Sequence, residues 1–181
     1  MNDPAMTASG YEREPDDFYR TPSWVTRVLL RHARLDAAVW EPAAGDGAIA
    51  DVLDAEGLAC RCSDLVDRGR GYELADFLAT RDRWGGDVVT NPPYKLAEPF
   101  VRHALSLTYE ARGKVAMLLR HEWDTAAGRH DLFQGAPFAK KITLLQRPRW
   151  FEGTTGSPRH AYAWFLWDWA HEGAPTLAWD R

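Results

Sequence analysis

Residues 91–94 read Asn-Pro-Pro-Tyr and directly follow a short strand-like run over 87–90. The two prolines lack N–H donors and stiffen the turn, so backbone carbonyls are left unpaired beside the Asn91 amide. The Asn91 side-chain oxygen and the Pro92 carbonyl could hold the two hydrogens of a planar amino group. They would then stabilise the positive charge that develops as its nitrogen attacks an electrophile. Tyr94 could stack on the same planar group. The alternative is an ordinary proline-rich turn.

A second motif, Glu-Pro-Ala-Ala-Gly-Asp-Gly-Ala-Ile over 41–49, follows the apolar run 37–40. Its two glycines allow the backbone to approach a ligand closely at the start of a helix. The motif lacks the third glycine of the dinucleotide fingerprint and the Gly-Lys-Ser/Thr of a phosphate loop. It therefore favours a smaller nucleoside ligand, although a plain strand-to-helix turn would look similar.

Two acidic positions follow the glycine turn. Asp64 ends the next predicted strand, where a carboxylate is placed to accept hydrogen bonds from ribose hydroxyls, or else to cap a turn. Asp76 precedes Phe77, and this pair could recognise an adenine amino group while the ring packs nearby. Phe77 could equally belong to the core.

With the glycine turn first and Asn-Pro-Pro-Tyr second, the chain resembles the class I methyltransferases, and among them the N6-adenine DNA methyltransferases. The resemblance covers residues 18–169 and is strongest to small phage and prophage members, whose late segment looks like 157–164. It implies direct methyl transfer from S-adenosylmethionine to adenine in DNA, with Asn91, Pro92 and Tyr94 as catalytic residues. The sequence has no Pro-Cys nucleophile, which argues against cytosine C5 chemistry.

The same resemblance implies a set of cofactor-binding residues. The segment Phe-Tyr-Arg-Thr-Pro over 18–22 looks like the one that contacts the methionine carboxylate in these enzymes. The glycine turn would bind the rest of the methionine, the acid after the second strand the ribose, and the Asp-Phe pair the adenine. The residues implied are Tyr19, Thr21, Glu41, Ala43, Gly45, Asp64, Asp76, Phe77 and Asn91.

Few residues are left to bind the substrate, because the chain has no room for a separate target-recognition domain. The segment 147–160 combines arginines with aromatic residues, which suits phosphate contact and base stacking. A surface loop with Trp150 and Phe151 tucked into the core would show the same composition. His121 and Glu122 follow another predicted strand and could face the substrate. The substrate-binding residues expected are Pro93, Arg149, Trp150, Arg159 and His160.

The elements that must position these residues alternate between strands and helices. This pattern predicts an α/β Rossmann-like class I methyltransferase fold, a mainly parallel seven-stranded sheet with helices on both faces. Ligands bind such sheets at the carboxyl ends of the strands, where both motifs fall. We expect residues 1–17 to form a flexible arm and 18–181 a single domain. Helices are expected over 22–32 (with Thr21 or Ser23 as cap), 49–56, 98–110 and 125–134, and strands over 37–40, 58–63, 87–90, 114–119, 141–146 and 161–169.

Composition limits the other classes of function. The formal net charge is −4, but basic residues outnumber acidic ones over 111–160, which could contact phosphates or form a solvated surface. No apolar stretch could span a bilayer, and the first residues do not form a secretory signal, so a cytoplasmic protein without membrane contact is expected. The two cysteines, Cys60 and Cys62, are too few for a zinc site and badly spaced for a disulfide, so no metal is expected.

Three functions remain open at this point. The first is adenine methylation in DNA, with double-stranded DNA as the expected partner. The second is methylation of adenine in RNA or of a glutamine amide in protein, since the Asn-Pro-Pro-Tyr motif also serves such enzymes. The third is a cofactor-binding module without catalysis, against which an intact Asn91 argues.

Overall fold

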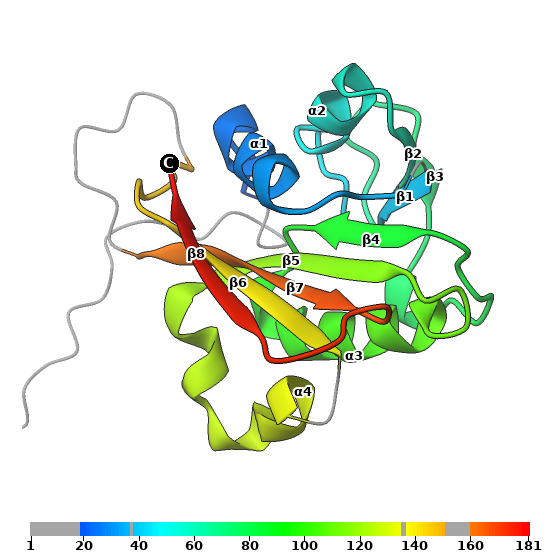
Figure 1. The fold of residues 1–181 in the computed structure, drawn as a ribbon. Helices are drawn as coiled ribbons and strands as arrows, with labels where there is room; N and C mark the ends of the chain where they lie inside the picture. The colour runs from blue at the N-terminus through cyan, green and yellow to red at the C-terminus, as the bar shows by residue number, and fades with distance from the viewer. Residues whose placement is uncertain (1–18, 37, 135–136, 151–159) are drawn as a thin grey trace, which may run out of the picture.

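The computed structural model describes residues 19–36, 38–134, 137–150 and 160–181, which form one mixed sheet with helices on both faces (Figure 1). The sheet has eight strands in the order β3-β2-β1-β4-β5-β7-β6-β8. All neighbouring strands run parallel except β7, which is antiparallel to both β5 and β6. The strands are β1 Ala38–Glu41, β2 Ala59–Asp64, β3 Glu73–Leu74, β4 Asp87–Thr90, β5 Lys114–Arg120, β6 Phe138–Leu144, β7 Tyr162–Asp168 and β8 Thr176–Asp180. The predicted α/β fold class is confirmed, but the sheet has eight strands instead of seven, and β3 and β8 lie outside the expected strand ranges.

The helices divide between the two faces of the sheet. Helices α1 (Ser23–His32) and α2 (Ala50–Ala55) cover one face, whereas α3 (Ala97–Thr108) and α4 (His130–Gln134) cover the other (Figure 1). Four short 3-10 segments complete the described elements: η2 Phe77–Ala79, η3 Tyr94–Leu96, η4 His121–Thr125 and η5 Ala127–Arg129. No helix in these ranges is long and apolar enough to cross a membrane.

Two apolar cores follow from this layering, because successive residues of a strand point to opposite faces of the sheet. On β7, Trp164 packs towards α1 and Trp167 towards α4, and both side chains are fully buried. Each indole N–H has a partner on its own face: Trp164 donates to the Val25 carbonyl at 2.9 Å, and Trp167 donates to the Leu132 carbonyl at 2.8 Å. Such bonds remove the cost of burying the indole nitrogen. They therefore fix both helix layers against one strand.

Two local predictions were wrong. Helix α1 begins after Pro22 without a side-chain cap, because the Thr21 hydroxyl accepts from Asn91 and the Ser23 hydroxyl accepts from Arg27. The helix expected over 125–134 is broken by the extended backbone of Ala126 (φ −80°, ψ 122°). Short 3-10 turns and α4 take its place.

Candidate active site

A cleft lies at the carboxyl ends of β1, β2 and β4, where the sequence placed the ligand site. Five segments line it, and they are far apart in the chain: 19–21, 41–49, 64–68, 75–78 and 91–100. The structure brings all the predicted cofactor-binding residues together in this cleft, and Pro93 with them. Pro92 and Tyr94 lie outside the lining.

The glycine turn after β1 requires glycine for its backbone conformation. Gly45 and Gly47 have φ values of 56° and 82°, in the left-handed region that disfavours other residues. Asp64, at the end of β2, holds the turn: one carboxylate oxygen accepts from the Gly45 N–H at 2.7 Å and the other from the Val66 N–H at 2.9 Å. Each carboxylate oxygen can accept a further hydrogen bond. Asp64 thus acts as a turn residue and still lines the cleft as a potential ribose ligand.

Glu41 ends β1 and is almost completely buried. Its carboxylate accepts from the Ala50 N–H at 3.0 Å, so it secures the first turn of α2. Burial raises the pKa of the Glu41 carboxyl well above its usual value, and the negative charges of Cys62, Asp64 and Asp46 add to this effect. This hydrogen bond links Glu41 to the backbone that follows the glycine turn.

The Asn91 amide has a fixed orientation at the end of β4. Its nitrogen donates to the Tyr19 carbonyl at 3.3 Å and to the Thr21 hydroxyl at 3.2 Å. Its oxygen is buried and has no hydrogen-bond partner among the described residues. A buried acceptor without a partner costs roughly 1–3 kcal/mol, so this oxygen is available to a donor from outside the chain.

Tyr94 lies behind Asn91 in a group of aromatic side chains. Its ring stacks on Tyr19, with 5.7 Å between centroids and 22° between planes, and also contacts Tyr162 at 5.7 Å. Burial raises the pKa of the Tyr94 hydroxyl well above its usual value, and the neighbouring Tyr162 adds to the shift. Because Tyr19 covers this ring, the predicted stacking of Tyr94 on a substrate would require the Tyr19 side chain to move.

Asp76 and Phe77 form the far side of the cleft. The Asp76 carboxylate accepts from the Leu78 N–H at 3.0 Å and so caps η2, while remaining exposed. Phe77 is 2% exposed and packs with Trp40 and Phe100, at centroid distances of 5.2 Å and 4.9 Å. Both sequence interpretations of Phe77 are consistent with this placement, since it is a core residue that also borders the cleft.

Sequence reasoning missed two apolar residues of the cleft. Leu65 is 71% exposed directly after Asp64, and Leu96 is 43% exposed in η3. Both side chains line the cleft, so they offer it an exposed apolar surface. An apolar residue immediately after the strand-end acid was the available signal.

Two of the expected substrate-binding residues lie in a second hollow beside the first. Arg149 and Trp150 line it together with Arg20, Pro22, Trp24 and Gln146. The Trp150 ring meets Tyr162 edge to face at 4.9 Å and lies 5.9 Å from Tyr19, so this hollow adjoins the aromatic group around Tyr94. His160 is exposed, whereas Arg159 and Phe151 lie outside the described residues.

The other strand-end pair, His121 and Glu122, begins η4 after β5. The His121 N–H donates to the Ala161 carbonyl at 2.9 Å, which ties this turn to the start of β7. Neither residue lines the cleft, and Trp123 after them is buried in the core. A role at the substrate stays a prediction.

Comparison with solved structures identifies the architecture, whereas no family model and no curated protein matches the sequence. The 23S rRNA methyltransferase ErmE is similar over 87% of this chain and 71% of its own, with 17% identity and a TM-score of 0.56. A candidate RNA methyltransferase from Pyrococcus horikoshii is similar over 83% and 85%, with 15% identity and a TM-score of 0.56. The fold is that of the class I methyltransferases.

A third similar structure is the modification subunit of a candidate type I restriction enzyme from Vibrio vulnificus YJ016. The likeness covers 90% of this chain but 47% of that subunit, with 15% identity and a TM-score of 0.53. At such identities the similarity concerns the fold, because one fold carries many activities. The function therefore has to be argued from the cleft itself.

Proposed function

We propose that the protein is an S-adenosylmethionine-dependent methyltransferase that methylates the N6 amino group of adenine in DNA. The observation that carries the proposal is the Asn91 side-chain oxygen, which is buried without a partner while the Asn91 nitrogen is held by Tyr19 and Thr21. An acceptor oriented in this way is suited to a substrate that brings its own donors, as an amino group does.

The cleft residues fit S-adenosylmethionine. Asp64 offers carboxylate oxygens to a ribose diol, and the exposed Leu65 offers an apolar surface to a flat base. Asp76 can accept from an exocyclic amino group, and Gly45 lets the backbone come close to the ligand. When bound, the cofactor supplies an electrophilic methyl group on a positively charged sulfur.

The chain's own residues would then act on the substrate nitrogen. An adenine amino group is a poor nucleophile because its lone pair is delocalised into the ring. The Asn91 oxygen and the Pro92 carbonyl would accept hydrogen bonds from the two N–H groups of this amino group. These bonds would favour a tetrahedral nitrogen and stabilise the positive charge that forms there. Thr21 and Tyr19 keep the Asn91 oxygen turned to the substrate, since they hold the nitrogen of the same amide.

The choice of nucleic acid rests on the second hollow. Arg149 and Trp150 offer a cation and an aromatic ring next to the catalytic segment, a combination that suits phosphate and base. Two of the proteins with a similar fold are a 23S rRNA methyltransferase and a modification subunit of a candidate type I restriction enzyme, which is in keeping with a nucleic-acid substrate. Double-stranded DNA is proposed over RNA because of the resemblance to small phage and prophage DNA methyltransferases, which includes the sequence of 157–164. The side-chain amide of glutamine in a protein is an alternative substrate.

The test is transfer of a labelled methyl group from S-adenosylmethionine to duplex DNA, single-stranded DNA, RNA and protein, followed by identification of the methylated base. Label on adenine N6 in duplex DNA is expected. Asn91→Ala should abolish transfer while cofactor binding, measured by calorimetry, is retained. Asn91→Asp keeps an oxygen acceptor and serves as the matched variant, with part of the activity left. Label in protein or RNA alone would contradict the proposed substrate, and cofactor binding without any transfer would favour a non-catalytic module.

A further inference from the structure

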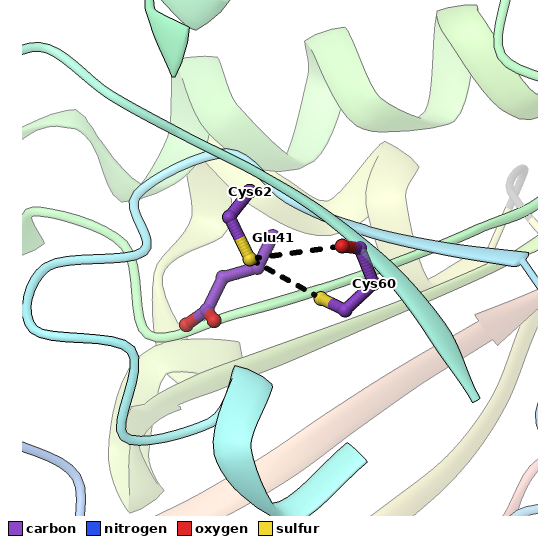
Figure 2. Close-up of side chains that lie close together, drawn as sticks. All are labelled: Glu41, Cys60 and Cys62. Atoms are coloured by element: carbon purple, nitrogen blue, oxygen red, sulfur yellow. Dashed lines mark hydrogen bonds between the residues drawn. The ribbon is translucent and has the colours of Figure 1, made fainter. Parts of the chain in front are cut away.

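Three potential metal ligands meet beneath the glycine turn. Cys60 and Cys62 are two residues apart on β2 and point to the same face, and Glu41 at the end of β1 is paired in register with Cys62. The two sulfur atoms are 3.6 Å apart, and one ligand atom from each of the three residues lies within 4.8 Å of the others. Figure 2 shows the two thiols and the Glu41 carboxylate grouped between the strands and α2.

We propose that Glu41, Cys60 and Cys62 bind a divalent ion of the zinc class. Cysteine thiolates and glutamate carboxylates are both ligands of Zn²⁺ in proteins. Zn–S bonds of about 2.3 Å in a tetrahedron place two sulfurs roughly 3.7 Å apart, which is close to the 3.6 Å observed. From the sequence alone we expected no metal site, because two cysteines are too few and the position of Glu41 beside them could not be predicted.

The competing explanation for paired cysteines is a disulfide. Such a bond requires sulfurs about 2.05 Å apart and a near-perpendicular dihedral, which neighbouring positions on one face of a strand reach only with backbone distortion. Both Cys60 and Cys62 belong to the regular ladder between β1 and β2. A shared ion needs no such change in the strand.

The burial of Glu41 also favours a cation. Its carboxylate is almost completely buried and accepts a hydrogen bond from the uncharged Ala50 N–H. A divalent ion bound there would neutralise the buried carboxylate.

The surroundings leave a place for a fourth ligand. Cys60 and Cys62 are only half-buried, so water can complete the tetrahedron. Arg61 lies between them in sequence but on the opposite face, where it covers the Trp40 ring at 4.2 Å and pairs with Glu73. Its charge is therefore directed away from the cluster. Because Glu41 also holds the Ala50 N–H, a bound ion would connect β1, β2 and the start of α2.

The test uses the full chain after treatment with a chelator. Zn²⁺ is titrated against a chromophoric competitor, and Co²⁺ is used as a spectroscopic probe because thiolate ligation gives a charge-transfer band. One equivalent of Zn²⁺ should bind, with protection of both thiols from a thiol reagent. Cys60→Ser, Cys62→Ser and Glu41→Gln should each weaken binding at least tenfold. The matched control is Glu73→Gln, which removes an acid on the neighbouring strand and should leave the affinity unchanged.

The proposal is independent of methyl transfer, since every readout is binding. Loss of the cobalt band in the serine variants, with circular dichroism unchanged, supports the site even if Glu41→Gln fails to fold. Equal Zn²⁺ affinity in the wild type and the double serine variant would overturn it. So would a folded Glu41→Gln variant that keeps full affinity, because the ion would then be held by exposed thiols alone.

Discussion

The Asn91 side-chain nitrogen donates to the Thr21 hydroxyl at 3.2 Å, across 70 positions of sequence. Thr21 precedes α1, whereas Asn91 follows β4, so the orientation of the Asn91 amide is set by a segment outside the Asn-Pro-Pro-Tyr motif. The buried Thr21 side chain gives this contact a defined geometry. Without it the Asn91 amide could turn its nitrogen to the substrate, which would present donors where acceptors are needed.

Thr21→Val should therefore lower kcat, because valine keeps the shape of threonine but cannot accept from Asn91. Loss of one buried hydrogen bond is worth about 1–2 kcal/mol, or roughly a five- to thirtyfold loss of turnover. The measurement is steady-state kinetics on DNA together with the cofactor dissociation constant. Thr21→Ser restores the hydroxyl and should recover most of kcat. If cofactor affinity fell as much as kcat, Thr21 would be a cofactor ligand rather than a positioning residue.

Two substitutions of Tyr94 should separate its ring from its hydroxyl. The hydroxyl is buried without a well-formed hydrogen bond among the described residues, although Tyr162 and Asn91 lie close enough to influence its pKa. Tyr94→Phe should thus leave the free energy of unfolding unchanged or raise it by about 1 kcal/mol, since an unsatisfied polar group is removed. Tyr94→Ala removes the ring that packs on Tyr19 and Tyr162 and should reduce turnover more than cofactor binding. Chemical denaturation and kinetics of both variants test this, and an equal loss of turnover and cofactor affinity in Tyr94→Ala would argue against a stacking role.

Asp64 should affect both cofactor affinity and stability. Its two oxygens each accept a backbone N–H that holds the glycine turn, and hydrogen bonds to a charged group are worth about 1.5–3 kcal/mol each. Asp64→Ala should lower the free energy of unfolding and weaken S-adenosylmethionine binding by at least tenfold. Asp64→Asn keeps one acceptor, so its loss of stability should be smaller. Unchanged stability in Asp64→Ala would show that the turn does not depend on these bonds.

Local signals explain why much of the site could be predicted from the sequence. The glycines at 45 and 47, the prolines at 92 and 93 and the acid at 64 mark strand ends, where short-range backbone chemistry decides the structure. The remaining features depend on contacts between distant segments. The stacking of Tyr19 on Tyr94 and the meeting of Glu41 with the cysteines follow from strand register, which no single segment encodes.

The strand β8 was missed for a related reason. Its run Thr-Leu-Ala-Trp-Asp is short, and Leu177 and Trp179 are exposed at 62% and 59%, so the strand lacks the burial pattern of an interior strand. It joins the sheet through parallel pairing with β6 and through ion pairs at its end. These ion pairs form only because the fold places α1 beside the C-terminus, which the sequence of β8 alone does not indicate.

The end of β8 leads to a prediction about pH. Arg31 donates two hydrogen bonds to the Asp180 carboxylate, at 2.8 Å and 3.0 Å, and His32 lies 2.8 Å from it. The Arg31 guanidinium holds the pKa of Asp180 well below its usual range. A lowered pKa means that the folded state favours the carboxylate. The stabilisation is therefore fully present when the pH is above about 3.9, the usual pKa of aspartate. It is lost as the pH falls towards the lower pKa that Asp180 has in the folded state.

Asp180→Asn should remove this contribution at neutral pH and make the stability of the variant less sensitive to acid than that of the wild type. Amide hydrogen exchange should become faster in β8 while the rates in β5 and β7 stay the same, because the interior of the sheet does not depend on Arg31. Glu56→Gln, an exposed acid at the end of α2, is the control and should behave as the wild type. Unchanged protection of β8 in Asp180→Asn would mean that backbone pairing with β6 alone holds the strand, and that the ion pairs follow its position without stabilising it.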